Sequence, residues 1–267
     1  MLLAPLALAM PVAGDAYEAS LVQAGLTRVM TLDRDEPVHT QLRPTLPGSL
    51  LGVDEDFRSD TSLKAGSTTT LGWTYTRFVS DRLALRLEAG VPSKVELSGA
   101  GIVAATGPSG AVFRIDLGEP SNNPLGSALQ WSPALVAVLR LGSPGASYRP
   151  YLALGARYTW FTHVDLDDTL QAQVQQRAAQ PLASAAGIPG PTTLQARAAP
   201  TLDPQVSVGV LRRLQGHWGW SASLSYSPLK TTSSVEARAA DGSRLFRSSS
   251  EVTGNVLIAA LAADFWY

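Results

Sequence analysis

The chain has 267 residues, of which 16% are charged, well below the roughly 25% that is usual in soluble proteins. Its formal net charge of −1 provides no electrostatic basis for binding nucleic acid, and the absence of cysteine excludes disulfide bonds and thiolate metal sites. No apolar run reaches the roughly 18 residues that a membrane-spanning helix requires. If the chain crosses a membrane, it must do so as a closed β-barrel, because open strand edges cannot be satisfied in lipid.

Residues 1–16 are predicted to be a truncated signal peptide. Leu2 to Met10 form a short apolar core, and small residues suited to cleavage follow it, near Gly14 or Ala16. The basic flank is missing, which indicates that the true start lies upstream; the alternative is an apolar N-terminal tail. Residues 17–267 are then expected to form a single β-barrel domain.

Three strands are predicted in the first third of the chain. Residues 21–30 alternate, with Val22, Ala24 and Leu26 on one face and polar or small residues on the other. After a long loop at 31–66, the alternating segments 68–79 and 83–91 are joined by a tight turn and form a hairpin.

The middle of the chain adds two more strands. A long loop at 92–129, rich in Gly, Ser and Pro, precedes strands at 131–141 and 148–161, which a short turn connects. The longest loop, 162–202, contains a short helix from Thr169 to Gln180, which Asp168 would cap and Pro181 would end.

The last third contains strands at 205–214 and 218–227, a loop at 230–242 and a terminal strand that ends at Tyr267. In segment 218–227 every even position is apolar or aromatic and every odd position is Gly or Ser, so the two faces of the strand differ. Trp and Tyr stand at both ends of the apolar face, as they do in strands that cross a bilayer.

Connections between the predicted strands alternate between long and short. Outer-membrane barrels have this asymmetry, and an even number of strands brings both chain ends to the periplasm. We therefore predict an all-β fold: an eight-stranded antiparallel transmembrane β-barrel with short periplasmic turns and long extracellular loops, located in the bacterial outer membrane.

The sequence resembles the OmpW family of eight-stranded outer-membrane barrels. The resemblance rests on 21–29 (LVQAGLTRV), 71–75 (LGWTY), 148–155 (YRPYLALG) and the aromatic C-terminus, and it covers all eight strands. It implies a narrow barrel with an apolar interior that passes small hydrophobic molecules. It also implies that Tyr267 is part of the signal read by the barrel-assembly machinery. The chain ends in Asp-Phe-Trp-Tyr where the family usually has a Tyr-Arg-Phe type of tail.

The inward positions of the strands predict two layers in the lumen. An apolar cup open to the exterior would be lined by Ala134, Val136, Val138, Val256 and Ile258. Charges near the periplasmic end would form a mutually neutralising ionic plug, because unpaired charges in a dry lumen are costly; its members are Arg86, Glu88, Arg140, Arg213 and Asp264. Each layer has an alternative interpretation. The apolar residues could simply pack the interior without binding a ligand, and the charged residues could simply fill the lumen as a structural plug.

No metal, cofactor or catalytic site is predicted. Acidic residues 54–56 lack a fixed ligand spacing, and His39, His163 and His217 are scattered over loops and a turn.

The predicted function is a channel for passive uptake of small hydrophobic molecules by a protein embedded in outer-membrane lipid. Alternatives are a structural or surface-recognition barrel acting through its loops and, less favoured, a lipid-modifying enzyme, because the serines of 218–227 point inward with no histidine nearby.

Overall fold

The computed structural model describes residues 20–32, 38–41, 56–59, 61–107, 110–143, 146–214 and 216–267. The predicted signal peptide and two of the three acidic residues considered for calcium, Asp54 and Glu55, lie outside these ranges. Within the described part of the chain, no helix is long and apolar enough to cross a membrane.

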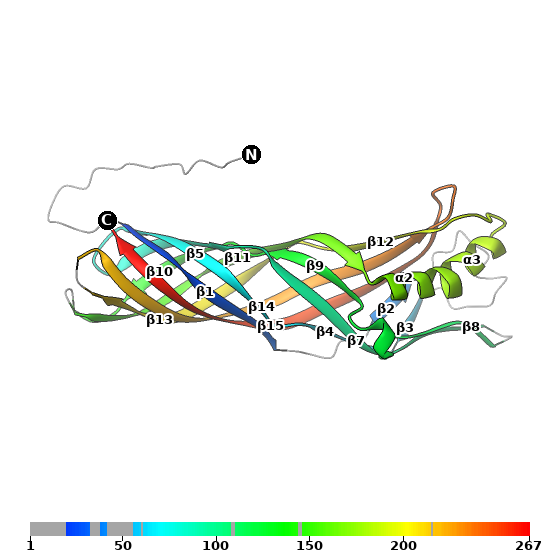
Figure 1. Ribbon diagram of the computed structural model, residues 1–267, viewed down its shortest axis with the longest axis horizontal. Helices are drawn as coiled ribbons and strands as arrows, with labels where there is room; N and C mark the ends of the chain where they lie inside the picture. The colour runs from blue at the N-terminus through cyan, green and yellow to red at the C-terminus, as the bar shows by residue number, and fades with distance from the viewer. Residues whose placement is uncertain are drawn as a thin grey trace.

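Eight antiparallel strands close into a ring, as predicted, with β1 joined to β15 at one seam (Figure 1). Around the ring, each strand is hydrogen-bonded to the next. The strands are β1 (Ser20–Leu32), β5 (Thr68–Phe78), β6 (Leu83–Gly90), β10 (Ala134–Arg140), β11 (Tyr148–Leu166), β13 (Thr201–Arg213), β14 (Trp218–Arg238) and β15 (Arg244–Trp266). Closure satisfies the backbone groups that an open edge would leave unpaired in lipid.

The outer face of the ring carries the apolar side chains that the alternation assigns to it. Leu26, Leu154 and Leu261 are 58%, 63% and 60% exposed, although they are large and apolar. Aromatic rings gather at both ends of this band: Trp131 stacks on Trp160 at one end, and other aromatic residues cluster at the other end, beside the chain terminus. Exposed apolar side chains between two aromatic belts are the surface of a transmembrane barrel.

Beyond the ring, the sheet continues into an extension at the end opposite the C-terminus (Figure 1). Strands β11, β14 and β15 run from the ring into this extension, and seven further strands build the rest of it. These are β2 (Val38–Gln41), β3 (Asp56–Ser59), β4 (Thr61–Ala65), β7 (Ser93–Gly107), β8 (Gly110–Asp116), β9 (Gly126–Trp131) and β12 (Thr193–Ala198).

The long connections thus leave the predicted end of the barrel, but much of their described length is strand instead of loop. Residues 230–238 belong to β14 although the sequence suggested a loop there. The cause is that a strand above the membrane has water on its outer face. It therefore needs no continuous apolar stripe, and the Lys, Thr and Ser of this segment are compatible with it.

The extension also contains a helical segment built from α2 (Asp168–Val174), η2 (Gln175–Ala179) and α3 (Gln180–Ala185), with a 3₁₀ turn, η1 (Pro120–Asn122), elsewhere. The carboxylate of Asp167, not Asp168, caps it by accepting hydrogen bonds from the next turn. The helix continues past Pro181, contrary to the prediction. A π-helical turn, η2, directly precedes α3, so the ring of Pro181 follows a widened turn.

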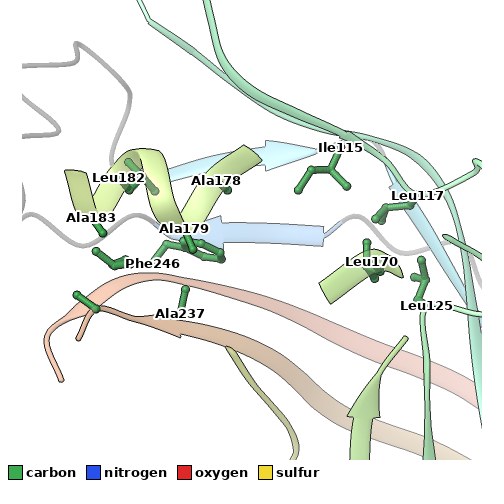
Figure 2. Packing of buried hydrophobic residues seen from close by; sticks show 12 residues of the cluster. Ile115, Leu117, Leu125, Leu170, Ala178, Ala179, Leu182, Ala183, Ala237 and Phe246 are labelled. Atoms are coloured by element: carbon green, nitrogen blue, oxygen red, sulfur yellow. The ribbon is translucent and has the colours of Figure 1, made fainter. Parts of the chain in front are cut away.

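A hydrophobic cluster holds the helical segment on the extension (Figure 2). Leu170, Ala179 and Leu182 from the helices pack with Ala237 and Phe246 from β14 and β15. The extension therefore has an apolar core of its own, separate from the interior of the ring.

Leu261→Arg is expected to lower the free energy of unfolding in lipid vesicles by about 2–4 kcal/mol, since Leu261 faces lipid midway between the two aromatic belts. Reversible urea unfolding in vesicles measures this. The control is Ala260→Ser, one position away and facing the lumen, which should change the free energy by less than about 1 kcal/mol. Equal losses in the two variants would contradict the assignment of faces.

Candidate functional site

The interior contains an apolar chamber of about 260 Å³ that lies mainly within the extension. Leucine, valine and isoleucine side chains from strands on several sides of the extension face it, and the helical segment adds Leu170 and Val174. The strand residues include Leu63, Leu97, Val103, Ile115 and Leu229, and Leu125 lies directly before β9. This apolar chamber can hold a small hydrophobic molecule without any charged partner.

A second chamber, of about 130 Å³, lies within the ring; its lining includes apolar side chains but is more polar than that of the apolar chamber, and we call it the polar chamber. Hydroxyl groups line it, among them Ser223, Ser225 and Ser227 on the inward face of β14. Val29, Gln130, Leu229 and Val256 line both chambers, so the two adjoin at this level, which we call the junction.

A buried ion pair crosses the polar chamber. The Arg157 guanidinium lies 3.6 Å from Glu88, and both side chains are more than four-fifths buried. Gln205 links the pair, because its amide nitrogen donates to Glu88 (2.8 Å) and its amide oxygen accepts from Arg157 (2.9 Å). Arg157 also donates to the carbonyl of Ser132 (2.9 Å). The charges of this network are neutralised and hydrogen-bonded, as buried charges require.

A second polar group lies nearer the periplasmic end. Arg86 donates to Thr76 (3.0 Å) and to the hydroxyl of Tyr151 (2.9 Å), and its guanidinium lies 4.6 Å from the centre of the Tyr151 ring. Tyr151 is paired with Gly209 on β13, and a Cβ atom at that glycine would come within 2.5 Å of the tyrosine ring. The glycine thus allows Tyr151 to lie across the lumen.

Asp264 is fully buried and accepts hydrogen bonds from Gln23 (2.9 Å) and Ser221 (2.7 Å). Below these polar groups, aromatic and aliphatic side chains close the ring. Phe78 stacks on Trp266 with ring centres 5.6 Å apart. The guanidinium of Arg140 also lies over the Phe78 ring, 3.9 Å from its centre. The periplasmic end of the described barrel is therefore filled by side chains.

The structure distributes the predicted plug residues over several levels. Arg86, Glu88 and Asp264 point into the lumen, but Glu88 pairs with Arg157, a residue that the prediction did not include. Arg140 lies against Phe78 at the periplasmic end. The charges do not form one compact plug.

Arg213 lies apart from the other predicted plug residues: its side chain is exposed and donates to the carbonyl of Gly216 in the adjacent turn. It is the last residue of β13. At the rim of the ring a long side chain can reach water and turn carbonyls whichever face the alternation assigns to it.

The predicted apolar lining divides in two. Val256 and Ile258 face the polar chamber, and Val256 also faces the apolar chamber. Ala134, Val136 and Val138 do not line either chamber; they are packed in a buried cluster with Tyr151 and other residues of the ring. Strand β10 begins at Ala134, already paired with Glu88, so its inward residues lie lower in the ring than the sequence suggested.

Most of the residues around the apolar chamber were missed because they lie in segments read as loops. A signal was present in one of them: residues 94–98, Lys-Val-Glu-Leu-Ser, alternate, and the two apolar members, Val95 and Leu97, face the chamber. His217 contacts the carbonyl of Trp266, and among the described residues no group of potential metal ligands comes together.

Glu88→Ala is expected to lower the free energy of unfolding by at least about 2 kcal/mol, because it leaves the buried Arg157 without its acidic partner. The control is Glu96→Ala, which breaks the exposed pair of Lys94 and Glu96 and should cost less than about 1 kcal/mol. Urea unfolding in vesicles would measure both variants. A loss no larger for Glu88→Ala than for Glu96→Ala would show that the lumen pair is hydrated and dispensable.

No protein-family model matches the chain, and no curated protein sequence matches it. Solved structures do match. The outer membrane protein OprG from Pseudomonas aeruginosa is 16% identical, with 92% of this chain and 95% of that chain covered and a TM-score of 0.60. The outer membrane protein AlkL, determined in DMPC lipid bilayers, is 14% identical, with 98% and 97% covered and a TM-score of 0.51. Both are eight-stranded barrels of the OmpW family. The resemblance seen in the sequence is thus confirmed at the level of the fold, which is that of a bacterial outer-membrane barrel.

Proposed function

We propose that the protein takes up small hydrophobic molecules at the cell surface and passes them to the outer membrane. The observation that carries this proposal is the apolar chamber in the extension, which is lined mainly by aliphatic side chains. An apolar cavity of about 150 Å³ holds one benzene molecule. A chamber of about 260 Å³ therefore suits a substituted aromatic or a medium-length hydrocarbon.

The route from this chamber is inferred to lead sideways. Downward, an apolar molecule would meet the hydroxyl groups and the ion pair of the polar chamber, and then the side chains that fill the periplasmic end. Sideways, a cavity lies where β11 and β12 approach one another. It shares five lining residues with the apolar chamber, two of them charged: Val164, Asp165, Leu166, Ala196 and Arg197. Above Thr159, no pairing between β11 and β12 is present in the described sheet.

The alternative functions have less support. A surface-recognition role would use outward side chains of the extension, whereas its apolar side chains turn inward around the chamber and the hydrophobic cluster. We infer that the protein is not an enzyme. Of the serines considered as nucleophiles, Ser221 donates its hydroxyl to Asp264 deep in the ring, away from any lipid substrate.

Leu97→Asp is expected to reduce uptake of labelled toluene into proteoliposomes at least about fivefold, because it places a charge on the wall of the apolar chamber. The matched control is Ser98→Asp, on the neighbouring, exposed position of β7, which should retain uptake. Both proteins should migrate as folded barrels. If both transport like wild type, the apolar chamber is not on the route.

We also propose that the C-terminal aromatic residue serves as the assembly signal. Tyr267 is about half exposed on the outer rim, and its backbone amide donates to Ser20 across the seam between β15 and β1. An exposed terminal side chain beside the closing seam is accessible to an assembly factor.

Tyr267→Ala is expected to lower the amount of folded protein in the outer membrane severalfold, because the assembly machinery would no longer read the terminus, while refolding of the purified variant in detergent stays near wild type. Heat-modifiable mobility on gels measures folded protein in both settings. Tyr148→Ala removes another exposed aromatic side chain and serves as the control. A parallel loss in cells and in detergent would instead indicate a role in stability.

A further inference from the structure

We propose that the preferred ligand of the apolar chamber is a neutral amphiphile with one terminal hydroxyl group, held with its apolar tail in the chamber and its hydroxyl at Asp203. This inference rests on the proposed function and names the ligand class of the same site. It follows from the chemistry of the junction, where the apolar chamber meets the polar one.

The junction is polar on one side and apolar on the other. Val29, Leu229 and Val256 continue the aliphatic wall of the apolar chamber, whereas Gln130 brings an amide to the same level. Gln130 already donates to Ser132 (2.9 Å), so a pure hydrocarbon that filled the chamber would leave only the remaining hydrogen-bonding capacity of this side unused. A molecule with one polar end would satisfy both sides at once.

Asp203 supplies the acceptor for that polar end. The residue after it, Pro204, accepts a hydrogen bond from Ser227 (2.9 Å), which places Asp203 at the level of Leu229 and so at the junction. The side chain lines the polar chamber and is only 7% exposed. Its Oδ1 atom accepts from Thr201 (3.1 Å), and the backbone of Lys230 lies beside the carboxyl group. Its Oδ2 atom has no hydrogen-bond partner.

The charges around Asp203 select among polar end groups. A carboxylate would be repelled by Asp203 itself, because two like charges in a confined site are unfavourable. An ammonium group would be attracted by Asp203 but repelled by Arg157, which is paired directly opposite Asp203 across β11 and β13, so the two effects offset each other. A hydroxyl group carries no charge and can donate to Oδ2, and a hydrogen bond to a charged acceptor is stronger than one between neutral groups.

Equilibrium dialysis against the full-length protein in nanodiscs tests the inference, with empty nanodiscs as the correction for lipid partitioning. The probes are octane, 1-octanol, octanoate and octylamine. 1-Octanol should bind about tenfold more tightly than octane, and both charged probes more weakly than 1-octanol. In Asp203→Ala the ratio of octanol to octane affinity should fall to about one. Asp241→Ala, in an exposed turn, is the control and should keep the wild-type ratio.

Each outcome bears on a separate claim. If octane and 1-octanol bind equally to the wild-type protein, water fills the junction and the hydroxyl preference is wrong, while the proposed function stands. If neither probe binds above the nanodisc background, the proposed function fails as well. If octanoate binds most tightly, an arginine and not Asp203 receives the polar end, and the inference is overturned. The probe series on the wild-type protein decides these cases even if Asp203→Ala does not fold.

Discussion

The structure depends on one constraint: backbone amides and carbonyls within lipid must all be paired inside the protein. The seam between β1 and β15 meets it, with a continuous antiparallel register from Leu21 opposite Trp266 to Leu32 opposite Asn255. Closure with eight strands then fixes a narrow interior, just wide enough for side chains or one small ligand. The filling of the ring by the Glu88–Arg157 pair, Tyr151 and the Phe78–Trp266 stack is a consequence of that width.

The same constraint explains why the larger chamber lies above the ring. Outside the hydrocarbon region, water can satisfy strand edges, so the sheet no longer has to be continuous. Strand β12 pairs with β14, and the described chain shows no pairing of β12 with β11 beside it. The extension can therefore enclose the larger, apolar chamber, and the helical segment adds Leu170 and Val174 to its wall.

The outer surface was predictable from the sequence and much of the interior was not. Lipid imposes a strict requirement on outward residues, so the alternation of Leu257, Leu261 and Phe265 defines both a strand and its face. Inward residues are selected by the side chains that they contact inside the barrel, and the alternation of a single strand does not reveal those contacts. Glu88 meets Arg157 because the registers of β6 and β11 with β10 place both residues beside Ala134, whose side chain is small. Val136 is low in the ring because β10 is short. Strands in water, such as residues 230–238, lack the lipid-facing stripe altogether.

Under the proposed function, the order of the two chambers determines which way a hydrophobic solute leaves the apolar chamber. A molecule with about 200 Å² of apolar surface gains roughly 5 kcal/mol when it leaves water for an apolar environment. The apolar chamber and the lipid acyl chains offer a similar gain, so transfer from one to the other is nearly neutral and follows the concentration gradient. Descent into the polar chamber would forfeit part of that gain, since hydroxyl groups and the ion pair form part of its wall. A solute with a hydroxyl group would lose less free energy at the junction, because it exchanges its hydrogen bond to water for a hydrogen bond to the protein. Under the proposed function, the more polar interior of the ring would act as a barrier that retains apolar solutes in the apolar chamber above it.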